Sequence, residues 1–308
     1  MDDEFNITYI TLDGYVELDK YRYIYICIMF IVYILTIFCN VSILYTIWIH
    51  NDLHEPMYIF IAGLLVNSVF YSTIMYPKLL ADFLSEKRTI SYPTCLFQFF
   101  IYYSLSASDF LLLSTMAYDR YVSICKPLQY PTIMRKTTVI ILLVLAWAAP
   151  ACHMAAEVIL RANMKLCHFN LSGIFCNNSI YSLFCVTPSS LTIFSFFALL
   201  NMGLLPFVFI IFTYTRILII TYRSSREVKN KAAQTCLPHI IVLISFCCLC
   251  AYDVITARLE SDVPKTVRSI ITLQAFLYYP LFNPVIYGLK MKEISKHLKK
   301  LFCQAKVI

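Results

Sequence analysis

Apolar residues along this chain gather in long uninterrupted runs, unlike the short alternating patterns of soluble domains. A helix of about 20 apolar residues crosses the ~30 Å hydrocarbon core of a bilayer. Seven runs are this long, and each is too short to cross twice. The pattern therefore predicts membrane spans at about residues 23–49, 56–80, 93–122, 137–157, 191–221, 231–255 and 267–289.

The segment after the seventh run has a different pattern. Between residues 290 and 302 one stripe carries Met291, Ile294, Leu298, Leu301 and Phe302, with lysines on the opposite face. This arrangement predicts a basic amphipathic helix on the inner leaflet, within a cytoplasmic segment that spans residues 290–308. The predicted fold class is an all-α membrane protein, a seven-transmembrane helix bundle with a short amphipathic eighth helix.

Prolines in the fifth and seventh expected spans affect the shape expected of those helices. Pro206 frees a backbone carbonyl in the fifth span and predicts a kink there. Pro280 and Pro284 stand four residues apart in the seventh span, and Asn283 precedes the second of them, where it can cap or redirect the helix. Breaks of this kind require neighbouring helices or water to satisfy the freed carbonyls.

Composition and charge agree with a bilayer as the solvent. The chain is 60% hydrophobic and 14% charged, whereas soluble domains average about half apolar and a quarter charged. If the N-terminus lies outside, the inner segments hold 15 of the 25 Lys and Arg residues. This bias predicts a plasma-membrane protein with an extracellular N-terminus at residues 1–22 and a cytoplasmic C-terminus. The net charge of +7 is therefore assigned to topology and not to nucleic-acid binding.

Two features of the expected outer segments agree with this orientation. Asn6 begins an Asn-Ile-Thr glycosylation sequon. Cys95, Cys167, Cys176 and Cys185 also lie outside, where disulfides form. Four cysteines allow three pairings, and the sequence does not choose among them. We expect one bridge to tie the start of the third span to the long outer loop, and the other to fold that loop upon itself.

The third uncharged run ends in Asp119-Arg120-Tyr121, so an acid–base pair sits where a span meets water. Charges at this depth are costly and usually mark function. Asp109 lies within the same span and has two interpretations. It is a structural acid bonded to neighbouring Asn or Ser side chains, or it belongs to an ion or activation site that includes Ser68.

Four segments, each on its own span and in this order, resemble the olfactory receptor family of rhodopsin-like (class A) G-protein-coupled receptors. They are PMYIFIA (Pro56–Ala62), MAYDRYVSICKPLQYPTIM (Met116–Met134), KAAQTCLPH (Lys231–His239) and PLFNPVIYGLK (Pro280–Lys290). Three outer-loop cysteines spaced nine and nine residues apart also fit, and the resemblance runs from about Asn40 to Lys290. The first and third segments resemble fish-type variants of the family more than the commonest mammalian sequences.

The resemblance implies the disulfides Cys95–Cys176 and Cys167–Cys185. It also implies that Asp119 holds Arg120 at rest and that Arg120 becomes available to a G protein on activation. The residues that the resemblance assigns to coupling and activation are Asp119, Arg120, Tyr121, Tyr214, Asn283, Pro284 and Tyr287.

The chain departs from the family pattern at Ser68, at the start of the sixth span, where Lys229 and Lys231 stand with no acid aligned to restrain Arg120, and at residues 246–248. The family's usual second-span Asp is replaced by Ser68, so a sodium ion near Asp109 would meet one carboxylate and bind more weakly. The family's Phe-Tyr-Gly segment in the sixth span reads Phe246-Cys247-Cys248, which removes the usual toggle aromatic.

By analogy the ligand site lies between the outer halves of the third, fifth, sixth and seventh spans. The residues in that zone are Tyr102, Tyr103, Ser106, Ala198, Met202, Cys250, Tyr252, Val254, Leu273 and Phe276. Phenols and a hydroxyl in an apolar cleft suit a small ligand with one or two polar groups. Helix–helix packing is the alternative interpretation for each of these residues.

The sequence thus predicts an odorant receptor that activates a stimulatory, olfactory-type heterotrimeric G protein. Its expected partners are a small-molecule odorant, the G protein and membrane lipid, without enzyme activity, cofactor, metal or nucleic acid. The alternative is a non-olfactory class A receptor for another small ligand or peptide, although Tyr102 stands where amine receptors commonly carry an acid.

Other functions fit the residues less well. A light receptor would need a lysine in the seventh span, and residues 269–289 contain none. An enzyme or transporter would need paired ionisable groups at the midplane, where only Asp109 stands. A channel is not excluded by one sequence. His153 and His239 are interpreted as structural, because no second ligand stands at metal-binding spacing.

Overall fold

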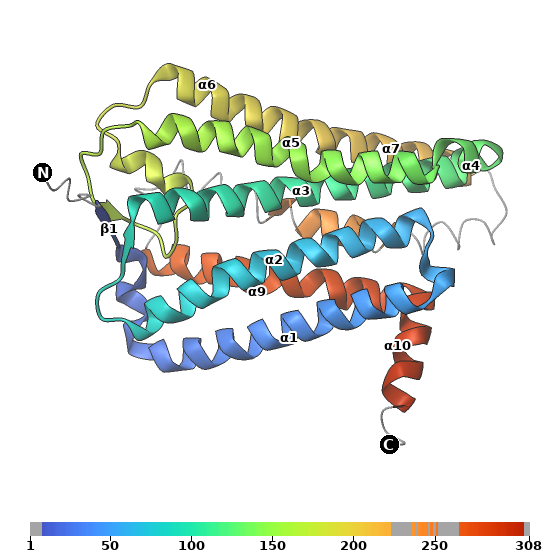
Figure 1. Ribbon diagram of the computed structural model, residues 1–308, viewed down its shortest axis with the longest axis horizontal. Coiled ribbons are helices and arrows are strands. Elements are labelled where there is room, and N and C mark those ends of the chain that lie inside the picture. The colour runs from blue at the N-terminus through green and yellow to red at the C-terminus, as the bar shows by residue number, and fades with distance from the viewer. Residues whose placement is uncertain are drawn as a thin grey trace, which may run out of the picture.

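The computed structural model describes residues 8–222, 236–237, 239–245, 247–248, 251 and 265–304. The long helices lie side by side in one bundle (Figure 1). They are α1 (Arg22–Ile49), α2 (Pro56–Leu84), α3 (Tyr92–Cys125), α5 (Lys136–Ala162), the continuous segment of α6 (Ser189–Ala198) and α7 (Leu205–Tyr222), and α9 (Lys265–Lys290). The shorter helices are α4 (Tyr130–Ile133) and α10 (Lys292–Gln304). Strand β1 lies at one end, here called the N-terminal end, while α4 and α10 lie at the opposite, C-terminal end (Figure 1).

Five helical segments in the described part of the chain are long and apolar enough to cross a membrane. They are Arg22–Ile49, Pro56–Leu84, Tyr92–Cys125, Lys136–Ala162 and Ser189–Tyr222. The apolar windows of α2 and α3 are 61% and 50% buried, whereas those of α1, α5 and the α6–α7 segment are only 22% buried. The second and third helices therefore form the centre, and the others expose apolar side chains that require lipid. The chain is a multi-pass membrane protein.

Most of the expected sixth span lies outside the described residues, although residues 239–245 are helical. Helix α5, the expected fourth span, is longer than its uncharged run, because it continues through Glu157 to Ala162. The fifth span contains a π-helical turn at Leu199–Leu204, in which the N–H of Leu205 donates to the carbonyl of Leu200. This wide turn ends two residues before Pro206, which has no N–H to continue the regular helical hydrogen bonds.

Helix α9 continues through both of its prolines, and two neighbouring helices bond the carbonyls that these prolines free. Pro280 and Pro284 provide no N–H for the carbonyls of Phe276 and Pro280. The Tyr76 hydroxyl donates to the Phe276 carbonyl at 2.7 Å, and the Asn40 amide donates to the Pro280 carbonyl at 3.0 Å. Asn283 does not cap a break, and its amide donates to the Ser68 hydroxyl at 3.3 Å.

A small sheet closes the N-terminal end of the bundle. Its strands β1 (Tyr9–Leu12), β2 (Thr89–Ser91) and β3 (Asn170–Leu171) lie in the order β2-β1-β3. Strand β1 is antiparallel to β2, with Ile10 opposite Ile90, and parallel to β3, with Leu12 opposite Leu171. The sequence analysis placed this N-terminal segment outside and assigned it no secondary structure. The sheet joins that segment to the loop before α3 and to the loop between α5 and α6.

Tyr15 fixes the segment after β1, a 3₁₀ helix at Asp13–Tyr21. Its side chain is 0% exposed, and its hydroxyl donates to the Ile174 carbonyl at 3.0 Å. The ring packs edge-on against Phe83 at 5.0 Å, and the Arg88 guanidinium lies 5.0 Å from the ring centre. Burial, followed by the Asp82 carboxylate and opposed by Arg88, raises the pKa of Tyr15 well above its ordinary value. The phenol therefore remains a hydrogen-bond donor.

We expect Tyr15→Phe to lower the free energy of unfolding by about 1–3 kcal/mol, because it leaves a buried carbonyl without its donor. Tyr9→Phe is the matched control, since Tyr9 is 59% exposed on the neighbouring strand. The melting temperature of the detergent-solubilised protein measures the effect. Equal melting temperatures for the two variants would contradict the role given to the Tyr15 hydroxyl.

Candidate functional site

The ion pair of the Asp119-Arg120-Tyr121 triplet lies near the C-terminal end of α3. The Nη2 and Nε atoms of Arg120 donate to Asp119 Oδ2 at 2.5 and 3.0 Å. Asp119 is 0% exposed and Arg120 is 9% exposed. A buried ion pair is stable when both partners are hydrogen-bonded, and it is costly to break by removing one of them. The pair can therefore act as a latch that opens only when another partner takes its place.

Tyr130 of α4 is a further partner of this pair, and the sequence analysis gave it no role. Its hydroxyl donates to Asp119 Oδ1 at 2.8 Å, so both carboxylate oxygens accept hydrogen bonds. Burial, followed by the Asp119 charge, raises the pKa of Tyr130, which keeps the phenol protonated. The only sequence signal was the position of Tyr130 inside the Met116–Met134 segment.

The other expected activation residues lie in the core around this pair. Tyr214 of α7 and Tyr287 of α9 are buried in one apolar cluster, and Tyr121 packs against it. The Tyr287 hydroxyl lies 3.3 Å from Nδ1 of His239, whose side chain is also buried. The sequence analysis interpreted His239 as structural, and its contact with Tyr287 agrees with that role. Within the described residues, the Tyr214 hydroxyl has no hydrogen-bond partner.

Asp109 lies nearer the middle of α3, before Asp119 in the sequence, in a buried polar group. The Asn67 amide donates to Asp109 Oδ1 at 2.7 Å, and the Trp147 indole donates to the Asn67 carbonyl oxygen at 3.2 Å. Ser68 accepts from Asn283 and donates to the Leu64 carbonyl at 3.0 Å. These bonds agree with the structural interpretation of Asp109, and a sodium ion at this position remains a prediction.

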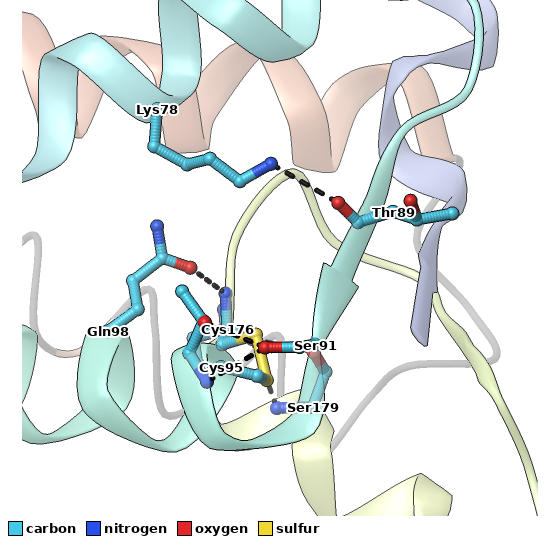
Figure 2. Close-up of a disulfide and its surroundings, with 9 residues drawn as sticks. Lys78, Thr89, Ser91, Cys95, Gln98, Cys176 and Ser179 are labelled. Atoms are coloured by element: carbon cyan, nitrogen blue, oxygen red, sulfur yellow. Dashed lines mark hydrogen bonds between the residues drawn. A yellow bond between two sulfur atoms is a disulfide. The ribbon is translucent and has the colours of Figure 1, made fainter. Parts of the chain in front are cut away.

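Two disulfides lie at the N-terminal end of the bundle. Cys95 at the start of α3 is bonded to Cys176, and Cys167 is bonded to Cys185, which are the pairs implied by the family resemblance. Figure 2 shows the first bridge beside Gln98, whose side-chain oxygen accepts from the Cys176 N–H at 3.0 Å. The bridge and this hydrogen bond hold the long loop against α3.

The loop residue next to this bridge, Phe175, forms the centre of an aromatic cluster. Its ring centre lies 4.8 Å from Tyr102 of α3 and 5.0 Å from Phe276 of α9. Tyr103 packs on Tyr102 at 4.8 Å, and its hydroxyl accepts from the loop N–H of Asn178 at 3.0 Å. The sequence analysis missed Phe175, although its neighbour Cys176 was already expected to bond to α3.

The structure brings some of the expected ligand residues together. Ala198, Leu273 and Phe276 are buried in one core cluster, and Tyr102 and Tyr103 pack against it. Ser106 and Met202 are partly buried on α3 and on the π-helical turn. The remaining members of the expected set, Cys250, Tyr252 and Val254, lie outside the described residues, as does Asn6.

A buried ion pair on α5 was also missed. Arg161 Nη2 lies 2.6 Å from Glu157 Oε1, and Ser195 of α6 donates to the same oxygen at 2.5 Å. Arg161 also donates to the Tyr181 hydroxyl at 2.7 Å and stacks over Phe99 at 4.2 Å. The available signal was the spacing of opposite charges by four residues, which suits one helix face. This pair connects α5, α6 and the long loop to the aromatic cluster.

The sequence model of the olfactory receptor family matches residues 26–305. This chain belongs to the olfactory receptor family. Human olfactory receptors 4E1 and 11A1 are each 32% identical to it, over 96% of this chain and 93% and 94% of their own lengths. Human olfactory receptor 11H1 is 33% identical over 90% of this chain and 85% of its own length.

Membership in the olfactory receptor family confirms the resemblance drawn from the four segments. This family of G-protein-coupled receptors is not enzymatic, as the sequence analysis expected. The resemblance to fish-type variants stays a prediction.

We expect Tyr130→Phe to raise ligand-independent signalling of this olfactory receptor. The change removes a hydrogen bond to a buried carboxylate, and such bonds contribute about 1.5–3 kcal/mol, so the resting equilibrium should shift by about tenfold or more. Basal cyclic AMP, normalised to surface expression, measures the effect. Tyr118→Phe is the control, because Tyr118 also packs on the core and, within the described residues, its hydroxyl makes no hydrogen bond to Asp119. Basal signals that match the control would contradict the latch role of Tyr130.

Proposed function

We propose that this chain is an odorant receptor that binds a small-molecule odorant within the bundle and activates a stimulatory, olfactory-type heterotrimeric G protein. The observation that carries the proposal is the buried Asp119–Arg120 pair at the C-terminal end of a bundle that belongs to the olfactory receptor family. Its partners are the odorant, the G protein and membrane lipid.

The proposed architecture has seven spans at 23–289, an extracellular segment at 1–22 and an amphipathic eighth helix with a cytoplasmic tail at 290–308. Both disulfides lie at the N-terminal end, which supports an outer position for that end because disulfides persist in oxidising surroundings. Helix α10 supports a cytoplasmic position for the C-terminal end, because its lysines suit the anionic inner leaflet. The plasma membrane is the proposed location.

The aromatic cluster is the proposed odorant contact region. It combines the rings of Tyr102, Phe175 and Phe276 with two phenol hydroxyls on adjacent positions of α3. Apolar surface with a few polar groups suits small, weakly polar molecules. The long loop supplies one of these rings directly, so ligand binding would depend on the Cys95–Cys176 bridge that holds the loop.

Coupling follows from a two-state equilibrium of the Asp119–Arg120 pair. At rest Asp119 holds Arg120, and in the active state Arg120 contacts the G protein while Tyr214 and Tyr287 support the opened end. An odorant shifts this equilibrium only by its difference in affinity for the two states. Asn283 and Pro284 belong to the same proposed set, because they lie on the α9 segment that carries Tyr287.

Arg120→Ala is expected to abolish the odorant-dependent rise in cyclic AMP in cells that express a stimulatory olfactory-type G protein. Arg216→Ala removes the positive charge of an exposed residue of α7 and serves as the matched control. A panel of volatile and water-soluble compounds identifies the agonist on the unmodified chain first. A response that persists in Arg120→Ala at equal surface expression would show that the pair does not couple.

Phe175→Ala is expected to lower agonist potency by about tenfold with an unchanged maximal response. The change removes ring contacts with Tyr102 and Phe276, and aromatic contacts are worth about 0.5–1.5 kcal/mol beyond buried area. Phe169→Ala alters the same loop at a 46% exposed position and is the control. Equal half-maximal concentrations for both variants would place the ligand elsewhere.

A further inference from the structure

A second polar cluster lies at the C-terminal end, where the first connecting segment meets α10. Asp52 belongs to a short 3₁₀ helix at Asn51–Leu53, between α1 and α2. Its Oδ2 atom lies 2.8 Å from Nε2 of His297, a residue 245 positions away in the sequence. The contact joins two segments that the proposed coupling pair does not use.

Helix α10 places a second carboxylate beside this contact. Glu293 and His297 stand four residues apart on α10, so both side chains lie on one helix face. The neighbouring residues Met291 and Ile294 are buried against the bundle, which holds α10 in position. One ligand atom each from Asp52, Glu293 and His297 lies within 4.8 Å of the other two.

The imidazole at the centre of this cluster is held firmly. His297 is buried, and its ring centre lies 3.8 Å from that of His50 at the end of α1. The Nδ1 atom of His50 lies 2.9 Å from the Thr46 carbonyl, which fixes the second ring. The first ligand is therefore ordered before any ion binds, as a metal site requires.

The two carboxylates can adjust to an ion. Their side chains are 56% exposed for Asp52 and 49% exposed for Glu293, so rotation costs little packing. Zinc–ligand bonds of about 2.0–2.2 Å place the ligand atoms of a tetrahedral site about 3.3–3.6 Å apart. Small rotations of the two carboxylates would bring the present ligand atoms, which lie within 4.8 Å of one another, to that spacing. Lys296 competes for Glu293 at 3.4 Å, but an exposed pair of this kind contributes about 1 kcal/mol or less.

We propose that Asp52, Glu293 and His297 form a binding site for a divalent transition-metal ion such as Zn²⁺, which ties the first connecting segment to α10. Three protein ligands leave a fourth position for water. An imidazole with two carboxylates favours zinc and its neighbours in the transition series, whereas magnesium and calcium prefer oxygen ligands alone. The proposal does not depend on the odorant or on the G protein.

Zinc binding to the full-length chain in detergent tests the site, after alkylation of the accessible thiols removes competing cysteine ligands. Glu293→Gln keeps the helix and removes one charged ligand, and we expect a loss of affinity of at least about tenfold. His297→Ala should abolish binding at this site. Excess Mg²⁺ should not displace the zinc.

His54→Ala is the matched control, because His54 is an exposed histidine of the same connecting segment outside the cluster. Zinc should raise the melting temperature of the unmodified chain and of His54→Ala, and leave that of His297→Ala unchanged. Zinc affinity that is the same in Glu293→Gln, His297→Ala and the unmodified chain would overturn the proposal. So would the absence of saturable binding to the unmodified chain.

Discussion

The bundle depends on the satisfaction of backbone carbonyls that prolines leave without a donor. The hydrocarbon core offers a freed carbonyl no bulk water, so its donor must come from a neighbouring helix or from an ordered water. Tyr76 of α2 and Asn40 of α1 supply these donors for two consecutive turns of α9. Each bond fixes α9 against one neighbour, and together they set the position of Phe276 at one end and of Tyr287 at the other. The two proposed functional regions are thus positioned by one constraint.

Helix α3 provides the second connection between these regions. It carries Tyr102 in the aromatic cluster, Asp109 in the buried polar group and Arg120 at the coupling end. The Asn67 side chain of α2 is hydrogen-bonded to Asp109 in the middle of α3, and Asn283 of α9 is hydrogen-bonded to Ser68, which also lies on α2. A displacement of α3 relative to α9 would therefore have to break or exchange buried hydrogen bonds. Such a bundle favours a few discrete arrangements over a continuous range.

The hydrophobic runs predicted most helices because span length is imposed by the bilayer and is readable from uncharged stretches. The same rule ended the predicted fourth span, which is helix α5, too early, because Glu157 and Arg161 form an ion pair within that helix. The strand at Tyr9–Leu12 was missed because its pairing partners lie in distant loops. Tyr130 and the Asp52–His297 contact were missed for a related reason: each is a contact that only the packed chain creates.

The resting state of the coupling end is held by the number of donors that Asp119 receives. Two come from Arg120, which is buried, and one comes from Tyr130, which is partly buried. Breaking a buried pair by removing one partner costs about 3–5 kcal/mol. A small odorant must supply differential affinity of similar size to reverse such an equilibrium alone. In the proposed mechanism, a G protein that offers new acceptors to Arg120 would lower that requirement, so the full response would need ligand and partner together.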